Sequence, residues 1–293
     1  MPSWFPLRLH HLSSGLVAVL VGYTSSAAII FQAAASAGAS AEQLGSWMTA
    51  LGLGMGFTTL GLSLAYRAPV LTAWSTPGAA LLITSLHGVA MGEAIAAFIF
   101  SSLLLTLVGF SGLFARVMHR LPMQLATAIL AGILLRFGLD LFRAVQLAPW
   151  LAGSMLLAYV ILRPWSPRYT IALVLLVGIA SAAIQDTLQP LPAASWLQLT
   201  WTTPVWHLSS LLGIGLPLFV VTMSSQNMPG VAVLRAHGYE QVSVSHAVCW
   251  SGLASLLLAP FGGFALNLAA ITAALCMTEQ ADARPDRRYL AAC

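Results

Sequence analysis

One segment of the sequence combines an extended stretch with the start of a new helix inside an apolar region. Residues 68–75 contain β-branched and polar residues, and residues 76–78 (Thr-Pro-Gly) open a second apolar run. Pro77 suits the first turn of a helix, which Ser75 or Thr76 would cap. A helix that starts inside a span presents free N–H groups and the positive end of its dipole. The chemistry predicted here is therefore the binding of a carboxylate or another anion.

A second segment with the same form lies near the end of the chain. Residues 262–268 contain two glycines and Asn267, and an apolar run follows from Ala269. Ala269 and Ala270, like Gly78 in the first segment, allow a ligand to come close to the backbone. Extended backbone in a membrane is tolerated only where protein buries it or where it lines a wet cavity, so two facing breaks predict a binding site. The alternative for each segment is a Pro/Gly kink in an ordinary helix.

Polar residues in two further apolar runs are expected to lie between these breaks. Hydroxyl and amide groups can orient a carboxylate without a fixed counter-charge. Serines in membrane helices often bond only to their own helix, whereas adjacent amides are costly in apolar surroundings unless they have partners. The predicted substrate-binding residues are Tyr23, Thr24, Ser25, Trp74, Thr76, Pro77, Gly78, Ser225, Gln226, Asn227, Asn267, Ala269 and Ala270.

Ionisable residues within apolar runs are the usual proton carriers of transporters. The candidates here are His87 and His246, which are expected to lie deeper in the membrane, and Glu93 at a span end. A hydrogen-bonded structural histidine and a solvated carboxylate are the alternatives. No acidic residue falls within the predicted site itself, so a proton could instead cross as part of the protonated acid.

The remaining reactive residues give no sign of an enzyme, a metal site or a cofactor. Cys249, Cys276 and Cys293 show no CxxC spacing and no neighbouring histidine cluster. No nucleophile elbow, phosphate-binding loop or zinc-protease motif is present in the sequence. We therefore predict a binding or transport protein.

The composition requires that these features lie in a membrane. Of the 293 residues, 59% are hydrophobic and 7% are charged, whereas a soluble domain has about a quarter charged residues. Long apolar runs between short polar breaks favour helical spans over a barrel. The twelve basic residues are all arginines, placed singly or in pairs. Membrane lipid is thus an expected partner and nucleic acid is not.

Apolar windows long enough to cross about 30 Å of hydrocarbon predict a multi-pass protein with ten spans. If the N-terminus is cytoplasmic, Arg136 and Arg143 are the exceptions among the twelve arginines to the positive-inside rule. The sequence therefore predicts a cytoplasmic N-terminus. The predicted spans are 12–35, 44–66, 68–89, 92–115, 121–142, 148–162, 169–186, 208–232, 243–260 and 261–277.

An internal repeat relates the two ends of the chain. Residues 25–26 and 224–225 are both Ser-Ser, and residues 42–43 and 240–241 are both Glu-Gln. Because seven spans separate the copies, the second copy would enter the membrane inverted. The expected fold class is an all-α polytopic membrane protein, an inverted-repeat (seven-plus-seven) transporter fold with two broken spans, here truncated to about ten spans. By the same offset a complete chain would run to roughly 385 residues.

Three motifs resemble the benzoate/proton symporters of the BenE type, and the resemblance covers nearly the whole chain. They are residues 69–79 (PVLTAWSTPGA), 227–230 (NMPG) and 262–267 (GGFALN). The resemblance implies a bacterial inner-membrane symporter related in fold to the uracil and nucleobase transporters. In those transporters, glutamates on the eighth and tenth spans hold the substrate ring. The corresponding positions here are Asn227 and about Ala270, and loss of both carboxylates fits an anionic substrate.

The resemblance also divides the chain into domains and implies a function. Residues 1–115 would form the first half of a core domain, 116–206 half of a gate domain with an outer loop, and 207–293 the second half of the core. The implied function is import of benzoate or a similar small aromatic carboxylate, with a proton. The alternatives are a transporter or exchanger of another small anion or a nucleobase, and a non-transporting truncated membrane scaffold. A homodimer is compatible with the sequence.

Overall fold

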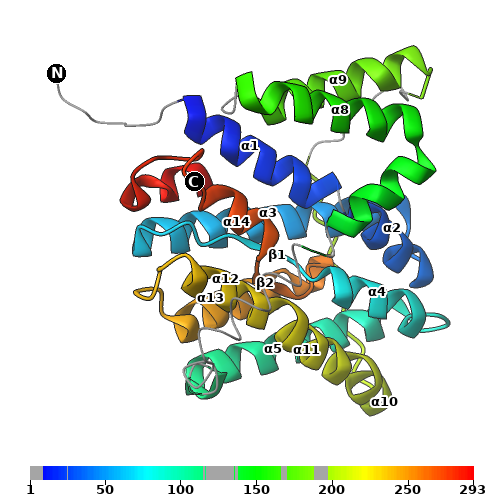
Figure 1. Cartoon of the computed structure of the whole chain (residues 1–293). Coiled ribbons are helices and arrows are strands. Elements are labelled where there is room, and N and C mark those ends of the chain that lie inside the picture. The colour runs from blue at the N-terminus through cyan, green and yellow to red at the C-terminus, as the bar shows by residue number, and fades with distance from the viewer. Residues whose placement is uncertain are drawn as a thin grey trace.

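The computed structural model describes residues 9–24, 26–114, 116, 135, 138–165, 170–187 and 197–293, and in this part the protein is mainly helical (Figure 1). Five helices of the described part are long and apolar enough to cross a membrane. They are His10–Ser36, Ala41–Tyr66, Met91–Ser111, Leu208–Ala236 and Val244–Phe261. The protein is therefore a multi-pass helical membrane protein, while the count of ten spans and the inverted repeat remain predictions.

The elements before residue 115 follow the predicted spans closely. The first predicted span, 12–35, is divided into two helices by a turn at Ser26, which the sequence did not indicate. The third predicted span, 68–89, is a strand followed by a helix. The elements are α1 (Leu9–Thr24), α2 (Ala27–Ser36), α3 (Ala41–Tyr66), β1 (Thr72–Trp74), α4 (Thr76–Ser85) and α5 (Met91–Ser111).

The elements after residue 137 include a long composite span and a second broken one. Of the 22 residues of the predicted span 121–142, 16 lie outside the described residues. The elements are α8 (Pro149–Trp165), α9 (Thr170–Ile184), α10 (Leu208–Ser210), the π-helical turn η1 (Leu211–Gly215), α11 (Leu216–Thr222), a second π-helical turn η2 (Met223–Asn227), α12 (Met228–Ala236), α13 (Val244–Leu258), the 3-10 turn η3 (Ala259–Phe261), β2 (Leu266–Leu268), α14 (Ile271–Cys276), the 3-10 turn η4 (Pro285–Arg287) and α15 (Tyr289–Ala292).

Helix α3 shows how local sequence sets the ends of a span. The Ser40 hydroxyl accepts the Gln43 backbone N–H at 3.2 Å, and the Gln43 side chain accepts the Ser40 N–H at 2.9 Å. This capping box satisfies two of the N–H groups that a helix start leaves without partners. At the other end, Arg67 adopts a left-handed conformation with φ of 48°, which stops the helix and turns the chain toward β1.

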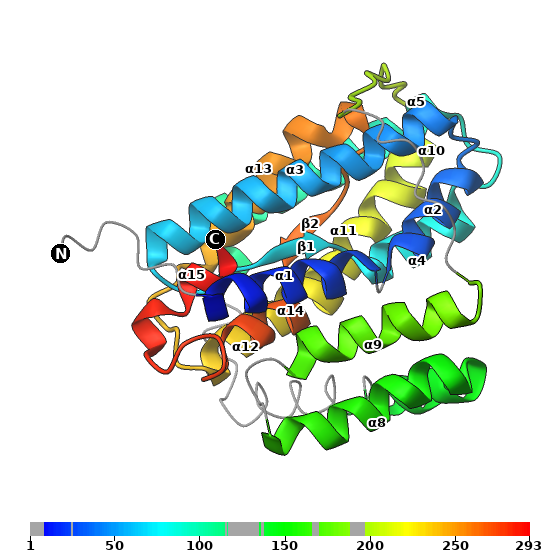
Figure 2. The same ribbon diagram turned by 90° about the horizontal axis from the view of Figure 1, so that it is seen from above.

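The two strands lie at the centre of the fold, where Figure 2 shows them running side by side among α3, α13, α1 and α11. They pair antiparallel, with Thr72 opposite Leu268 and Trp74 opposite Leu266. The two stretches predicted to be extended are therefore extended, and they meet, although they are distant from each other in the sequence. Each strand is followed by a helix, α4 or α14, as the sequence analysis predicted.

Close helix contacts surround the strands. A Cβ on Gly109 of α5 would lie 2.5 Å from the Cys249 backbone N of α13, and one on Gly252 would lie 2.8 Å from the Thr106 N. Glycine at both positions lets the two backbones touch. The buried residues of the two hydrophobic clusters come from the parts of the chain before residue 115 and after residue 213. Helices α8 and α9 pack on each other at one flank, with α9 next to α1 (Figures 1 and 2).

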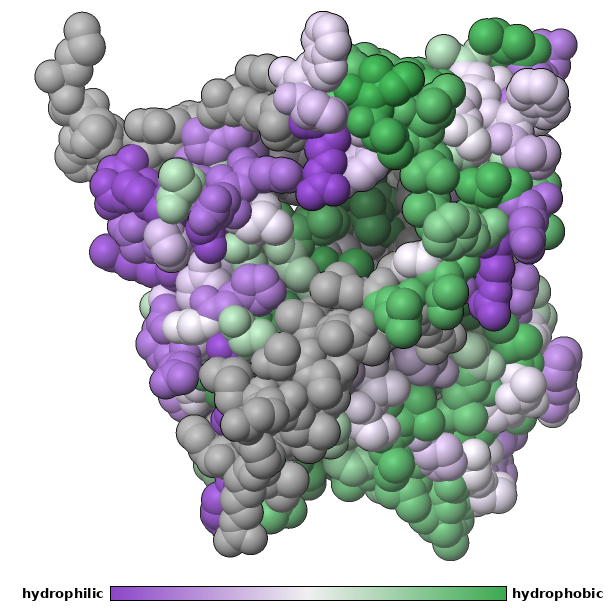
Figure 3. All heavy atoms as spheres, in the orientation of Figure 1, coloured by the Kyte–Doolittle hydropathy of each residue, from purple (hydrophilic) through white to green (hydrophobic). Residues whose placement is uncertain are grey.

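Large apolar side chains cover much of the outer surface. Phe57 on α3, Phe110 on α5 and Leu257 on α13 are each more than two thirds exposed, at 71%, 85% and 68%. Such a surface suits lipid as the surrounding solvent. Figure 3 shows hydrophobic residues over the right and lower parts of this face and a gathering of hydrophilic residues near the C-terminal segment. It also shows a hollow in the middle of the face, bordered mainly by hydrophobic residues.

Candidate functional site

The paired strands form the centre of the candidate site, and their backbone hydrogen bonds extend beyond the strand pairs themselves. The Ser75 N–H donates to the Ala265 carbonyl at 3.1 Å, and the Ala269 N–H donates to the Leu71 carbonyl at 2.9 Å. These bonds continue the ladder to the points where α4 and α14 begin. Because extended backbone inside a membrane cannot bond to lipid, each remaining polar group on the outer edges also needs a protein partner.

Hydroxyl groups of α3 supply partners for the Thr72 N–H of β1 and for Val70 just before the strand. The Thr59 hydroxyl accepts the Thr72 N–H at 2.9 Å. The Ser63 hydroxyl accepts the Val70 N–H at 3.1 Å and donates to the Val70 carbonyl at the same distance. One face of a membrane helix thus takes the place of a third strand. This role was not predicted from the sequence, although the hydroxyl residues at positions 58, 59 and 63 of an apolar helix could have indicated it.

Helix α13 and the turn η2 complete the outer edge of β2. The Ser255 hydroxyl accepts the Leu266 N–H at 2.9 Å, and the Asn227 side-chain oxygen accepts the Leu268 N–H at 3.1 Å. The Asn227 side-chain nitrogen donates to the Asn267 side-chain oxygen at 2.6 Å. Both asparagines are 0% exposed. The predicted need of Asn227 for partners is met by the protein, and its amide ties the eighth predicted span to the strand pair.

Replacement of Ser255 by alanine tests this edge. The Leu266 N–H would lose its acceptor in a buried position, and we expect the free energy of unfolding to fall by about 1–3 kcal/mol. Thermal unfolding in detergent measures the change. The matched control is Ser224→Ala, because Ser224 is exposed and donates only within its own helix, to Val220 and Val221. Equal unfolding temperatures for the two variants would contradict the role given to Ser255.

Two aromatic residues predicted to bind substrate meet beside the strands. The rings of Tyr23 and Trp74 lie edge to face, with 4.8 Å between centroids and 77° between planes. Trp74 is buried, and its indole N–H donates to the Ser26 hydroxyl at 2.8 Å. Ser26 lies in the turn between α1 and α2, so the break in the first span forms the partner for the Trp74 indole. Tyr23 is partly buried.

The start of α4 lies immediately after β1. Ser75 is the cap: its hydroxyl accepts the Gly78 N–H at 3.0 Å, and its carbonyl accepts the Ala79 N–H at 2.8 Å. The prediction of free N–H groups is therefore wrong for Gly78, because the helix caps itself there. Pro77 lies in the first turn, as predicted, and Thr76 and Pro77 are partly buried. The positive end of the helix dipole still points toward this region.

The start of α14 is enclosed more tightly. Ala269 and Ala270 are buried, and α14 has only six residues. A Cβ on Gly22 of α1 would lie 3.3 Å from the Thr272 Cγ2 atom, and one on Gly230 of α12 would lie 2.5 Å from the Leu268 Cβ atom. Helices α1 and α12 therefore pack closely against the residues on either side of the two alanines.

The other predicted polar residues lie on η2, at the end of α1 or outside the described residues. The Ser225 side chain is exposed and its hydroxyl donates to the Val221 carbonyl, and Gln226 is partly buried. Thr24 ends α1, and Ser25 lies outside the described residues.

The three candidate proton carriers lie at element ends. His87 is exposed in the turn after α4, and His246 is exposed in the first turn of α13, with its Nδ1 atom 3.1 Å from the Tyr66 hydroxyl. Both histidines therefore lie at element ends and are exposed, and their depth in the membrane remains a prediction. Glu93 lies in the first turn of α5 and is partly buried, and it accepts a hydrogen bond from the Ser210 hydroxyl.

Comparison with known proteins assigns nearly the whole chain to a family. A family model described as "Benzoate membrane transport protein" matches residues 6–293. The chain is 48% identical over 282 residues to the "Inner membrane protein YdcO" of Escherichia coli, covering 96% of this chain and 72% of that protein. It is 38% identical over 279 residues to the "Benzoate membrane transport protein" of Acinetobacter baylyi, covering 95% and 71%. No solved structure matches. The chain therefore belongs to the benzoate membrane transport family, a family of transport proteins and not of enzymes.

Proposed function

We propose that this chain is part or all of a secondary transporter that imports benzoate or a similar small aromatic carboxylate across the bacterial inner membrane. Two relatives support the substrate and the membrane: one is named as a benzoate transport protein and the other as an inner membrane protein. The multi-pass helical structure provides the scaffold that such an activity needs. A proton accompanies the substrate in this proposal.

The observation that carries the proposal is the aromatic pair of Tyr23 and Trp74 beside the start of α4. Aromatic rings attract the edge or face of another ring, so a benzoate ring fits against Tyr23. The positive end of the ten-residue α4 favours a carboxylate on the same side. One small molecule that has both groups satisfies both features.

The proposed site divides into contact residues and supporting residues. Thr76, Pro77 and Gln226 are only partly buried and Ser225 is exposed, so they are the proposed contacts together with Tyr23. Trp74, Gly78, Ala269 and Ala270 shape the site from buried positions. Asn227 and Asn267 hold the strand pair in register through their amide contact.

Transport in this proposal moves a core against a gate, with the N-terminus in the cytoplasm. The core comprises residues 1–115 and 207–293, which supply the buried clusters around the strands, and the gate comprises residues 116–206. Glu93, His87 and His246 are accessible at element ends, where each could exchange a proton with water. Entry of the protonated acid is the alternative route for the proton.

Uptake of labelled benzoate into proteoliposomes tests the proposal. We expect an inward proton gradient to raise the initial rate and a protonophore to remove that increase. Tyr23→Leu should reduce uptake at least tenfold, because it removes the aromatic surface, while the control Tyr159→Leu on α8 should not. Benzoate uptake and binding that are equal in wild type and Tyr23→Leu would contradict the site.

Competition separates the substrate classes. Inhibition by substituted benzoates alone supports the aromatic carboxylate. Stronger inhibition by an inorganic oxyanion or a nucleobase would show that this compound, and not an aromatic carboxylate, is the substrate. If labelled benzoate is not taken up and does not change the unfolding temperature in detergent, the result favours a scaffold without transport.

A further inference from the structure

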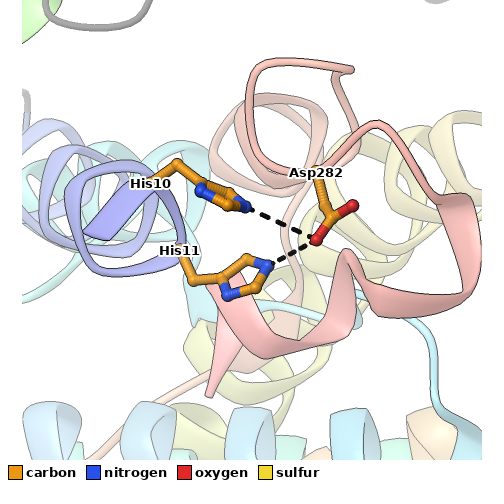
Figure 4. Close-up of side chains that lie close together, drawn as sticks. All are labelled: His10, His11 and Asp282. Carbon is orange, nitrogen blue, oxygen red and sulfur yellow. Dashed lines mark hydrogen bonds and ion pairs between the residues drawn. The ribbon is translucent and has the colours of Figure 1, made fainter. Parts of the chain in front are cut away.

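Two histidines of the first helix and an aspartate near the end of the chain form a buried cluster away from the paired strands. His10 and His11 lie in the first turn of α1, and Asp282 lies between α14 and η4. The Nε2 atoms of His11 and His10 lie 2.8 and 3.5 Å from the same oxygen of Asp282, Oδ2. Figure 4 shows the two imidazole rings converging on that oxygen from the same helix.

The cluster is almost completely buried. His10, His11 and Asp282 are 7%, 1% and 7% exposed. The Arg284 backbone N–H donates to Oδ1 of Asp282, and the Nε2 atoms of both imidazoles lie beside Oδ2. Carboxylates buried in this way are usually paired with another group or coordinate a metal ion.

The guanidinium groups of Arg284 and Arg288 make their hydrogen bonds to other groups than the Asp282 carboxylate. The Arg284 side chain turns away and pairs with Asp286 at 2.7 Å. The Arg288 side chain donates to the backbone carbonyls of Asp282 and Met277, at 2.9 and 2.7 Å. The two arginines therefore position the segment, and the Arg284 backbone N–H fixes Oδ1 of Asp282 at 2.8 Å. Oδ2 therefore faces the imidazoles. In metal sites, hydrogen bonds from surrounding groups often orient the ligating side chains in this way.

We propose that His10, His11 and Asp282 form a binding site for a divalent transition-metal ion of the zinc type. The three ligand atoms lie within 4.8 Å of one another. Ligands placed about 2.0–2.1 Å from a tetrahedral zinc ion are roughly 3.3 Å apart, close to the 2.8 and 3.5 Å between the nitrogens and the oxygen. Two imidazoles and one carboxylate are a typical zinc ligand set, with the fourth position left for water.

Binding changes the protonation of the imidazoles and ties together two distant parts of the chain. Each histidine would bind through Nε2 with its ring proton on Nδ1, so protons compete with the metal and affinity falls at acidic pH. The ion would join the start of α1 to the segment after α14. These positions are 271 residues apart in sequence. The folded protein should therefore be stabilised by the ion, since the unfolded chain lacks the site.

Zinc titration of the purified chain tests the site, after treatment with EDTA and without a polyhistidine tag. We expect one equivalent of Zn²⁺ to bind by calorimetry and to raise the unfolding temperature by several degrees. Co²⁺ in its place should give the visible absorption bands of a tetrahedral site with nitrogen and oxygen ligands. Asp282→Asn and His11→Ala should each weaken zinc binding at least tenfold, while His246→Ala and Glu42→Gln, which alter exposed residues elsewhere, should not.

Two results would overturn the proposal. One is equal zinc affinity in Asp282→Asn and in the two control variants. The other is the absence of tetrahedral Co²⁺ bands from the wild-type protein, a result that does not depend on whether any variant folds. Either would leave the cluster as a hydrogen-bonded tie between the two segments. Neither result bears on benzoate uptake, so the two proposals can fail separately.

Discussion

Alanine at position 262 is expected to destabilise the protein strongly, although it adds only one methyl group. Gly262 has φ of +87°, and a Cβ there would lie 1.7 Å from the Trp47 Cδ1 atom. The Trp47 ring cannot move aside, because Phe98 and Phe264 pack against it with centroids at 5.4 and 5.8 Å. The strained backbone and the overpacked core together should cost about 2–5 kcal/mol.

Thermal unfolding and expression in the membrane measure this effect. The matched control is Gly61→Ala in α3, where the glycine is exposed and a Cβ would meet no atom within 4 Å. Alanine is favoured over glycine in a helix, so this control should be neutral or slightly stabilising. An unfolding temperature for Gly262→Ala equal to that of the control would show that the contact between Trp47 and the turn before β2 is not rigid.

Leucine at position 227 should remove both stability and transport. The buried Leu268 N–H would lose its acceptor, and the buried Asn267 side-chain oxygen would lose its donor. Each buried polar group left without a partner costs about 1–3 kcal/mol, so we expect a total loss of about 2–6 kcal/mol. Since Asn227 links η2 to β2, benzoate uptake should be lost together with the strand pairing.

A neighbouring amide separates the two effects. Gln226 is only partly buried, so Gln226→Leu should keep the wild-type unfolding temperature while reducing benzoate affinity. Unfolding scans and binding isotherms on both variants measure the difference. A stable Asn227→Leu protein with wild-type affinity would refute the supporting role of the asparagine pair.

The sequence predicts the broken spans well because local chemistry determines them. The Ser-Thr-Pro-Gly run contains a cap, a proline for the first turn and a residue that permits close packing, and α4 begins there. Apolar length likewise sets the spans predicted at 44–66 and 243–260, which correspond to α3 and α13 with its following turn. The family could also be predicted, because three short motifs, each continuous in the sequence, resemble those of the family.

The roles of individual polar groups could not be predicted, because their partners are distant in sequence. The Asn227 side-chain nitrogen donates to Asn267, 40 residues away. The Ser26 hydroxyl in the turn of the first span accepts its hydrogen bond from Trp74, 48 residues away. The cluster of His10, His11 and Asp282 joins the two ends of the described chain and has no spacing that marks a metal site.

The sealed edges of the strand pair restrict how the protein can change shape. A shift of either strand by one residue would turn Trp74 or Asn267 to the opposite face and separate the edge N–H groups from the hydroxyls of Thr59, Ser63 and Ser255. One strand therefore cannot slide along the other without breaking these hydrogen bonds. In the proposed transport cycle, β1, β2, α3 and α13 would therefore move together as a single rigid body, with the hinges elsewhere in the chain.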